Sequence, residues 1–190
     1  MEKLVEVRWH GRGGQGAVTA SKLLATSALA EDKYIQAFPE YGPERMGAPI
    51  QSFTRISNAP IKIHCHVTNP NIVVVLDHTL LKVVDVTEGL TEDGVLIVNS
   101  EDSPTQIREK LKIKGRKIYT VNASKIAQED IGRPLPNTPL IGALIKATEL
   151  LSLENVLEDI KGKFKKKFSS KIIEGNVNAI KRAYQEVKGE

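Results

Sequence analysis

The sequence contains a single cysteine and no long apolar run. One cysteine, Cys65, among 190 residues excludes an internal disulfide and an iron–sulfur cluster held by the thiolates of this chain alone. No apolar stretch approaches the roughly 20 residues of a membrane-spanning helix, and the N-terminus leads straight into a strand pattern without a signal peptide. We therefore expect no membrane contact and a cytoplasmic location, with any metal or cluster chemistry on another polypeptide.

Aromatic residues are few, and neither sign of charge dominates. Aromatics make up 5% of the chain, and 27 basic against 23 acidic residues give a net charge of +4. No aromatic-rich basic signature accompanies this excess, so we expect no nucleic-acid partner. In the basic run 161–168 a solvated helix end is favoured over a docking patch for an acidic partner or a phosphate-bearing ligand. The length and the 41% share of hydrophobic residues predict one domain over residues 1–190.

Glycine, by contrast, is concentrated in one loop near the N-terminus. The run Gly11-Arg12-Gly13-Gly14-Gln15-Gly16 lies between a strand-like segment, 5–10, and a helical pattern from Ala17 to about residue 31. A strand, a glycine loop and a helix N-terminus together present backbone N–H groups to an anion. The spacing satisfies G-x-G-x-x-G, which is typical of dinucleotide-binding loops.

Two features weaken the dinucleotide interpretation. The first strand alternates, with Val5, Val7 and Trp9 on one side and polar residues on the other, so we expect its polar side to meet water, a ligand or a partner. The second strand, 34–38, should be followed by an acidic residue that holds the ribose, but its window offers Gln36, and Glu40 lies beyond a proline. A standalone dinucleotide-binding oxidoreductase stays the weaker alternative.

The rest of the pattern predicts an α/β fold with three layers, α/β/α, around a mixed, mainly parallel sheet. Continuous apolar runs typical of central strands occur at 72–76, 94–99 and 117–121. Two alternating runs, 50–56 and 61–67, predict a β-hairpin at an edge of the sheet or folded over it. Helical spacing covers 104–112, 138–150, 153–166 and 170–187, and Asn137 or Thr138 is a candidate cap for the second of these helices.

Few residues offer chemistry of their own. His64 and His66 would project from one strand face and could ligate zinc, but no third ligand has convincing spacing, and Cys65 is expected to be a small buried residue. Asp77 and Asn99 follow strands, where α/β sheets place ligands. No nucleophile elbow, Walker loop or acid/base pair is apparent, so we predict neither a catalytic residue nor a metal ligand in this chain.

The loop 38–49 is long and rich in proline and glycine, yet it carries bulky and charged side chains. Its carboxylates, Glu40 and Glu44, lie beside Tyr41 and Arg45. Long loops of this kind are often functional, and the mixture of rigid and bulky residues predicts an ordered one. Its polar groups suit an interface, a polar ligand or an internal ion pair that braces the loop.

Two segments closely resemble the gamma subunits of 2-oxoacid:ferredoxin oxidoreductases, with pyruvate:ferredoxin oxidoreductase as the nearest member. They are Arg8-Trp9-His10-Gly11-Arg12-Gly13-Gly14-Gln15-Gly16 and Gln36-Ala37-Phe38-Pro39-Glu40-Tyr41-Gly42-Pro43-Glu44-Arg45-Met46-Gly47-Ala48-Pro49. The later segments 70–77 and 137–143 are similar to the family as well. The likeness spans nearly the whole chain, and neither motif departs from the family pattern.

The resemblance implies a subunit that is inactive alone. The family enzyme decarboxylates a 2-oxoacid, passes electrons to ferredoxin and makes an acyl-CoA; with pyruvate it makes acetyl-CoA and CO2. Thiamine diphosphate, Mg and iron–sulfur clusters are implied on the alpha, beta and delta partner chains, and CoA on a path shared with them. The gamma domain is associated with CoA handling, and in some archaea it serves both the pyruvate and the 2-oxoisovalerate enzymes. A non-catalytic scaffold that binds partners but no ligand is the remaining alternative.

We expect the glycine loop and the loop 39–49 to lie together at the carboxyl ends of two neighbouring parallel strands, facing the partner chains and the CoA path. Arg12 and Arg45 could pair with phosphate or carboxylate groups there. The candidate residues of this CoA path or subunit interface are Arg12, Gly13, Gly14, Gln15, Gly16, Glu40, Tyr41 and Arg45.

Overall fold

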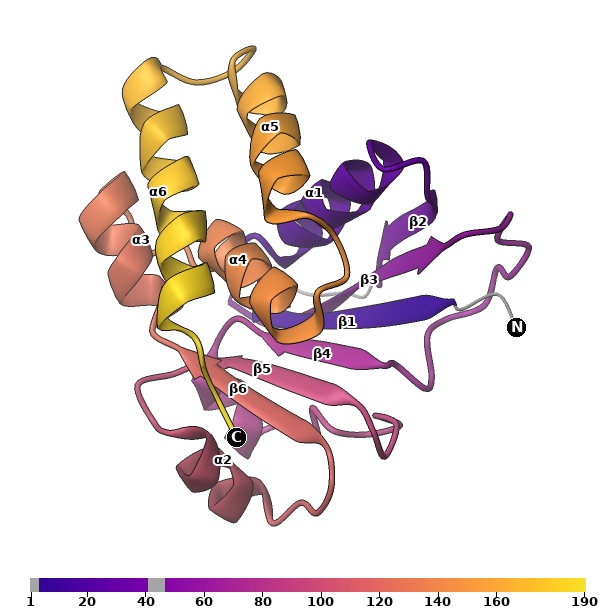
Figure 1. Cartoon of the computed structure of the whole chain (residues 1–190). Helices are drawn as coiled ribbons and strands as arrows, with labels where there is room; N and C mark the ends of the chain where they lie inside the picture. The colour runs from indigo at the N-terminus through magenta and orange to yellow at the C-terminus, as the bar shows by residue number, and fades with distance from the viewer. Residues whose placement is uncertain (1–3, 41–46) are drawn as a thin grey trace.

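A seven-stranded sheet forms the middle of the molecule in a computed structural model that describes residues 4–40 and 47–190 (Figure 1). The strand order is β2-β3-β1-β4-β5-β6-β7. The strands are β1 (Val5–Arg12), β2 (Tyr34–Pro39), β3 (Pro49–Ser57), β4 (Ile72–Val75), β5 (Val95–Asn99), β6 (Lys117–Val121) and β7 (Lys188–Gly189). Strands β1, β4, β5 and β6 pair in parallel, while β3 and β7 run antiparallel to their neighbours. The predicted mixed, mainly parallel sheet is confirmed.

Helices cover the two faces of this sheet unequally (Figure 1). The larger hydrophobic cluster lies under α1 (Ala17–Leu29), α4 (Asn137–Thr148), α5 (Leu153–Phe164) and α6 (Ser170–Glu186). The helix α3 (Ala123–Ile131), which the sequence analysis missed, packs beside α4 and α6. On the other face a smaller cluster lies under α2 (Pro104–Leu111) and the 3-10 helix η1 (His78–Lys82). The three-layer α/β/α architecture is therefore confirmed, with one thick and one thin outer layer.

The predicted central strand at 72–76 is present as β4. Strand β4 occupies the middle of the sheet, and the side chains of Val73, Val74 and Val75 are completely buried. Val74 joins the larger hydrophobic cluster and its two neighbours join the smaller one. This alternation between two buried faces is the reason why a continuous apolar run identified the strand.

Strand β1 is also central, and the expectation that its polar side meets water, a ligand or a partner is wrong. Arg8 and His10 are only 5% and 3% exposed. The Arg8 guanidinium donates from Nη2 to the carbonyl oxygens of Val86 at 3.1 Å and Glu88 at 2.5 Å. Burial, with a smaller effect of the Arg8 charge, lowers the pKa of His10 to about 3, so its imidazole is neutral at ordinary pH. The chain thus covers this polar side with its own backbone.

The predicted hairpin over 50–56 and 61–67 is wrong. Strand β3 pairs with β1 and β2 instead, and residues 61–67 form no strand. Their carbonyl groups are bound by a side chain: Arg55, 1% exposed, donates to the oxygens of Ile63 at 3.4 Å and Cys65 at 2.8 Å. Because Arg55 takes the place of a partner strand, the segment has no need of a backbone ladder.

The histidines of this segment consequently share no strand face. His64, Cys65 and His66 are all exposed, so the expectation of a buried cysteine is also wrong. Among the described residues no group of three histidine, cysteine, aspartate or glutamate side chains is placed to hold a metal ion. None of the helices within residues 4–40 and 47–190 is long and apolar enough to cross a bilayer.

The start of α4 differs from the predicted cap. Pro136 occupies the cap position, and no side chain caps the helix. Thr138 donates its hydroxyl to Oδ1 of Asn176 on α6 at 2.8 Å instead. Thr138 therefore joins two helices rather than ending one.

We expect Arg55→Ala to destabilise the chain by about 3–5 kcal/mol, because it leaves a largely buried carboxylate and several carbonyl groups without their donor. Arg55 Nε lies 2.8 Å from Oε1 of Glu6, whose side chain is 18% exposed. The control is Lys110→Ala, which breaks an exposed ion pair with Asp102 and should cost less than about 1 kcal/mol. Urea unfolding followed by circular dichroism measures both, and equal losses would contradict this role of Arg55.

Candidate functional site

The glycine loop and the end of the loop 39–49 lie against each other, as predicted. The backbone N–H of Gly13 donates to the carbonyl of Ala48 at 3.0 Å, and that of Gly47 donates to the carbonyl of Gly13 at 3.3 Å. The expected reason was wrong, since β3 separates β1 from β2. The loops meet because β3 begins at Pro49, directly opposite Arg12 at the end of β1.

The remaining loop candidates divide into described and undescribed residues. Glu40 is exposed just beyond β2, and its backbone N–H donates to the carbonyl of Gln51 at 3.1 Å. Tyr41, Glu44 and Arg45 lie outside the described residues, as do all of the residues 41–46 of the loop that was expected to be ordered.

Asp77, at the carboxyl end of β4, holds the glycine loop in place. Its Oδ2 accepts from Arg12 Nε at 3.1 Å and from Gln15 Nε2 at 2.9 Å. Its Oδ1 accepts from the backbone N–H of Thr79 at 2.9 Å and from the Thr79 hydroxyl at 2.7 Å. We call Arg12, Gln15, Asp77 and Thr79 the loop brace, since together they tie the ends of β1 and β4 to η1.

The loop brace also fixes the charge of Asp77. Burial alone would raise the pKa of this carboxyl group, but the hydrogen bonds from Thr79 and Gln15 and the charge of Arg12 outweigh burial. The pKa of Asp77 therefore lies below its ordinary value, and the carboxylate is ionised at neutral pH.

Arg12 has few donors left for a ligand. Besides its bond to Asp77, its guanidinium donates from Nη2 to the Thr79 hydroxyl at 2.9 Å and from Nη1 to the Gly47 carbonyl at 3.1 Å. Gln15 Oε1 accepts from the Arg12 backbone N–H at 2.7 Å. Each nitrogen of the side chain thus donates to a group of this chain. These bonds hold the loop in its conformation, and they favour this role of Arg12 over phosphate binding.

Gly16 is the point where the loop joins the helical layer. Its φ is +85°, and a Cβ there would lie 2.6 Å from Nδ2 of Asn137, the first residue of α4. Only glycine accepts both the conformation and the contact. Gly14, at φ +97°, is exposed with open space around it, so its backbone is available to a neighbouring molecule.

Sequence reasoning missed part of this site. Asp77 was recognised as a residue that follows a strand, but its pairing with Arg12 and Gln15 was not predicted, because 65 and 62 positions separate it from them. The contact of Asn137 with Gly16 had no signal in the sequence. At the next strand end, Asn99 donates to the Leu76 carbonyl at 2.8 Å and accepts from the Ser124 N–H at 3.1 Å, so it joins strand ends and α3.

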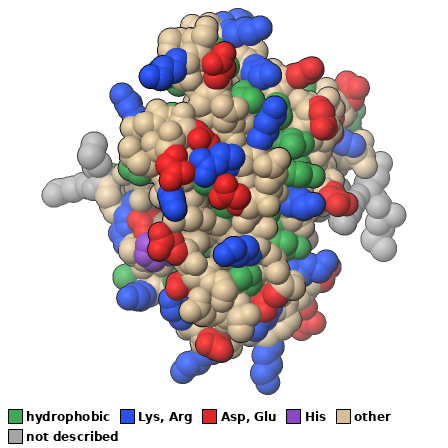
Figure 2. Space-filling view, turned by 60° about the vertical axis from the view of Figure 1, so that its left-hand side comes forward, with side chains coloured by type: hydrophobic (Ala, Val, Ile, Leu, Met, Phe, Trp, Pro, Cys, Tyr) green, Lys and Arg blue, Asp and Glu red, His purple; other side chains and the backbone are tan. Residues whose placement is uncertain are grey.

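Charged side chains of both signs are interspersed over the face shown in Figure 2. Arg182 on α6 pairs with Glu129 and Asp130, each at 2.9 Å, and with Glu186 at 3.1 Å. The hydrogen bonds to Glu129 and Asp130 raise the pKa of Arg182. This face carries no broad patch of one charge that would suit a nucleic-acid backbone.

Comparison with known proteins gives matches along nearly the whole chain. The family model described as "Pyruvate ferredoxin/flavodoxin oxidoreductase" matches residues 6–186. A relative from Pyrococcus furiosus, named "Pyruvate/ketoisovalerate oxidoreductases common subunit gamma", is 49% identical over 185 residues, which cover 97% of this chain and 98% of the relative. "Pyruvate synthase subunit PorC" from Thermotoga maritima is 47% identical over 187 residues, covering 98% and 96%.

Solved structures agree. The crystal structure of pyruvate oxidoreductase subunit PORC from Thermotoga maritima has a TM-score of 0.87 and 44% identity, with 99% of each chain covered. A gamma subunit of a keto/oxoacid ferredoxin oxidoreductase from Geobacter sulfurreducens, at 21% identity, has a TM-score of 0.72 over 97% of this chain and 96% of that one. The last likeness shows a shared fold only.

We expect Gly16→Ala to cost about 3 kcal/mol of stability, since the new methyl group adds a clash with Asn137 to the strain of a positive φ. The matched control is Gly14→Ala, which has a positive φ but open space and should cost about 1 kcal/mol. In an Asn137→Ala background the cost of Gly16→Ala should fall toward that of the control. Equal costs at the two glycines, or no coupling to Asn137 in urea unfolding, would contradict the contact.

Proposed function

Because this chain belongs to the pyruvate ferredoxin/flavodoxin oxidoreductase family, we propose that it is the gamma subunit of a pyruvate (2-oxoacid):ferredoxin oxidoreductase, also called pyruvate synthase. The complex converts pyruvate, CoA and oxidised ferredoxin to acetyl-CoA, CO2 and reduced ferredoxin. The observation that carries this proposal is the 47–49% identity to gamma-type subunits over almost the full length of both chains. The chain is a subunit of an enzyme without being an enzyme by itself.

The cofactors of the reaction belong on partner chains. An iron–sulfur cluster needs several cysteine thiolates gathered at one place, and Mg bound together with a diphosphate needs one or two carboxylates beside the phosphates. Here the one cysteine is exposed, and within the described parts of the chain no three potential ligands converge. We assign thiamine diphosphate, Mg and the iron–sulfur clusters to alpha, beta and delta subunits, which also meet ferredoxin. CoA and ferredoxin are cytoplasmic reactants, and we place the complex in the cytoplasm.

The glycine loop is the part of this chain that we assign to contact with those subunits. Two uses were open: binding the phosphates of CoA, or holding a neighbouring chain. Each side-chain nitrogen of Arg12 donates to a group of this chain, Asp77, Thr79 or Gly47, while Gly14 has an exposed backbone. Both observations favour the neighbouring chain. The proposed contact residues are Arg12, Gly13, Gly14, Gln15, Gly16, Glu40, Tyr41 and Arg45.

The first experiment purifies a tagged form of this chain from its native source. We expect partner chains that carry thiamine diphosphate and iron–sulfur clusters to co-purify. The preparation should reduce a viologen dye only when a 2-oxoacid and CoA are both present. If no thiamine enzyme co-purifies, or if the chain alone turns over a 2-oxoacid, the proposal is wrong.

The second experiment separates the two uses of the glycine loop through Arg12→Ala. Loss of the guanidinium should weaken retention of the chain in the complex, because the loop loses three hydrogen bonds, to Asp77, Thr79 and Gly47. The KM for CoA of intact complex should stay unchanged. Lys22→Ala, an exposed cation on α1, is the control and should change neither. A KM for CoA raised tenfold or more with assembly intact, which corresponds to about 1.4 kcal/mol or more of lost binding, would show that the loop binds CoA. Micromolar binding of CoA to the isolated chain in titration calorimetry would show the same.

A further inference from the structure

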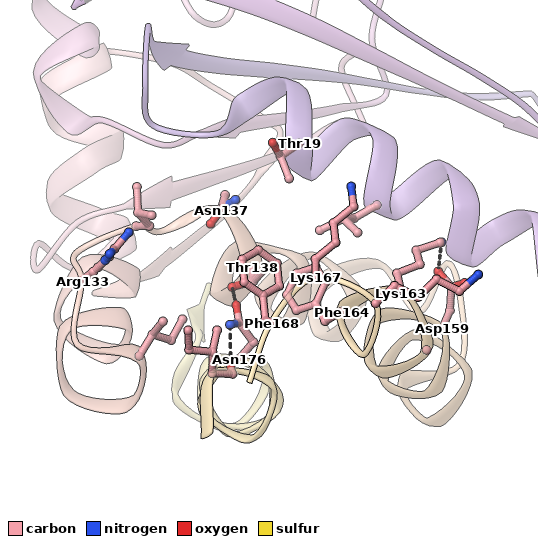
Figure 3. A pocket seen from close by; sticks show the side chains of 16 residues that line it. Thr19, Arg133, Asn137, Thr138, Asp159, Lys163, Phe164, Lys167, Phe168 and Asn176 are labelled. Carbon is pink, nitrogen blue, oxygen red and sulfur yellow. Dashed lines mark hydrogen bonds and ion pairs between the residues drawn. The ribbon is translucent and has the colours of Figure 1, made fainter. Parts of the chain in front are cut away.

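A groove of about 930 Å³ opens in the helical layer beside the glycine loop (Figure 3). Helices α1, α4, α5 and α6 and the connection between α3 and α4 supply its walls. Its apolar lining consists of Leu23, Ile131, Leu135, Phe164, Phe168 and Ile172. No residue of the loop brace lines it, so the groove is a separate surface feature.

Much of this apolar lining is open to solvent. Leu135, Phe168 and Ile172 are 37%, 45% and 39% exposed, and they account for three of the seven large exposed hydrophobic side chains in the described residues. Phe164 and Phe168 meet edge to face, with ring centroids 5.1 Å apart. Apolar side chains gathered in one depression of a surface are typical of an interaction site.

The rim of the groove is basic. Arg133, Lys166 and Lys167 are exposed and form no ion pair within the described residues. In Figure 3, Lys167 extends from the turn between α5 and α6 toward α1. A fourth cation, Lys163, pairs with Asp159. Most of the basic run 161–168, for which a solvated helix end was favoured, therefore lines an apolar groove, with Lys161 and Lys165 outside it.

Four of the polar side chains that line the groove, Thr138, Asn176, Asp159 and Lys163, already have partners. The Thr138 hydroxyl donates to Asn176 Oδ1 at 2.8 Å, and Asn176 Nδ2 donates to the Ile172 carbonyl at 2.8 Å. Asp159 accepts from the Ser27 hydroxyl at 2.9 Å as well as from Lys163. A site for a small polar molecule has convergent, available polar groups. This groove offers apolar area and a basic rim instead, a combination suited to one face of a peptide helix.

We propose that the groove docks an acidic amphipathic helix of another protein chain. Apolar side chains of that helix, three and four positions apart, fill the space beside Leu135, Phe168 and Ile172. Its carboxylates face Arg133, Lys166 and Lys167, which gives the contact its charge complementarity. A helix about 10–12 Å wide laid here also approaches the glycine loop, because Asn137 both lines the groove and contacts Gly16.

The inference rests on the proposed function in one respect: the chain that supplies the docked helix is another subunit of the proposed complex. Photo-crosslinking tests the two separately. A benzoylphenylalanine replaces Phe168 in the tagged chain, and the control carries it at Tyr34, 47% exposed on β2. Recovery of the complex tests the proposed function. Irradiation of the recovered complex then tests the groove.

We expect the label at position 168 to join a single partner peptide that is acidic and has apolar residues at helical spacing, and the label at position 34 not to reach that peptide. A crosslink confined to this chain, or one to a peptide without acidic and helical patterning, would overturn the proposal while leaving the complex intact.

A charge-reversal pair tests the rim. Lys166→Glu with Lys167→Glu should weaken retention of this chain in the complex by about tenfold, and less so at high salt. Lys165→Glu with Lys171→Glu changes the net charge equally at exposed lysines outside the groove and should change retention less than about twofold. Thermal melting checks that both variants are folded. Equal effects of the two pairs would show a general charge effect and overturn the proposed contact.

Discussion

The buried guanidinium groups of Arg8 and Arg55 constrain how one face of the sheet is covered. Both side chains lie on the same side of the sheet, and they are 5% and 1% exposed. A buried cation without compensating partners costs several kcal/mol of folding free energy. Backbone carbonyls supply much of the compensation: those of Val86 and Glu88 for Arg8, and those of the segment 63–66 for Arg55. Arg55 also pairs with the Glu6 carboxylate at 2.8 Å. Irregular segments rather than helices therefore cover this side of β1 and β3.

The opposite face is covered by most of the helices, and the features proposed for function gather there or at its edge. The loop brace holds the end of β1 against β4, and Gly16 lies against Asn137 at the start of α4. Asn137 also lines the basic-rimmed groove. A partner chain that reached both the glycine loop and the groove would thus contact one continuous surface, held by bonds that need no ligand to form.

The spacing of apolar residues along the sequence predicted most of the strands and helices whose side chains form the hydrophobic clusters. The apolar runs identified β4, β5 and β6, and helical spacing identified every described α-helix except α3, in which five of the nine residues are polar. Long-range polar contacts were beyond prediction from the sequence. Arg55 binds carbonyl groups of the segment that was expected to form a hairpin strand, and that segment is irregular. Arg8 binds the carbonyl of Val86, 78 residues away. In the candidate site, the motifs identified the glycine loop, but Asp77 and Asn137 reach it only through the tertiary fold.

Reconstitution tests the central claim most directly. The partner chains of the complex are prepared without this chain, and 2-oxoacid- and CoA-dependent reduction of ferredoxin is measured before and after its addition in equal amounts. The account predicts negligible turnover by either part alone and recovery of activity when they combine. Full activity of the partner chains without this subunit, or turnover by this subunit alone, would contradict it.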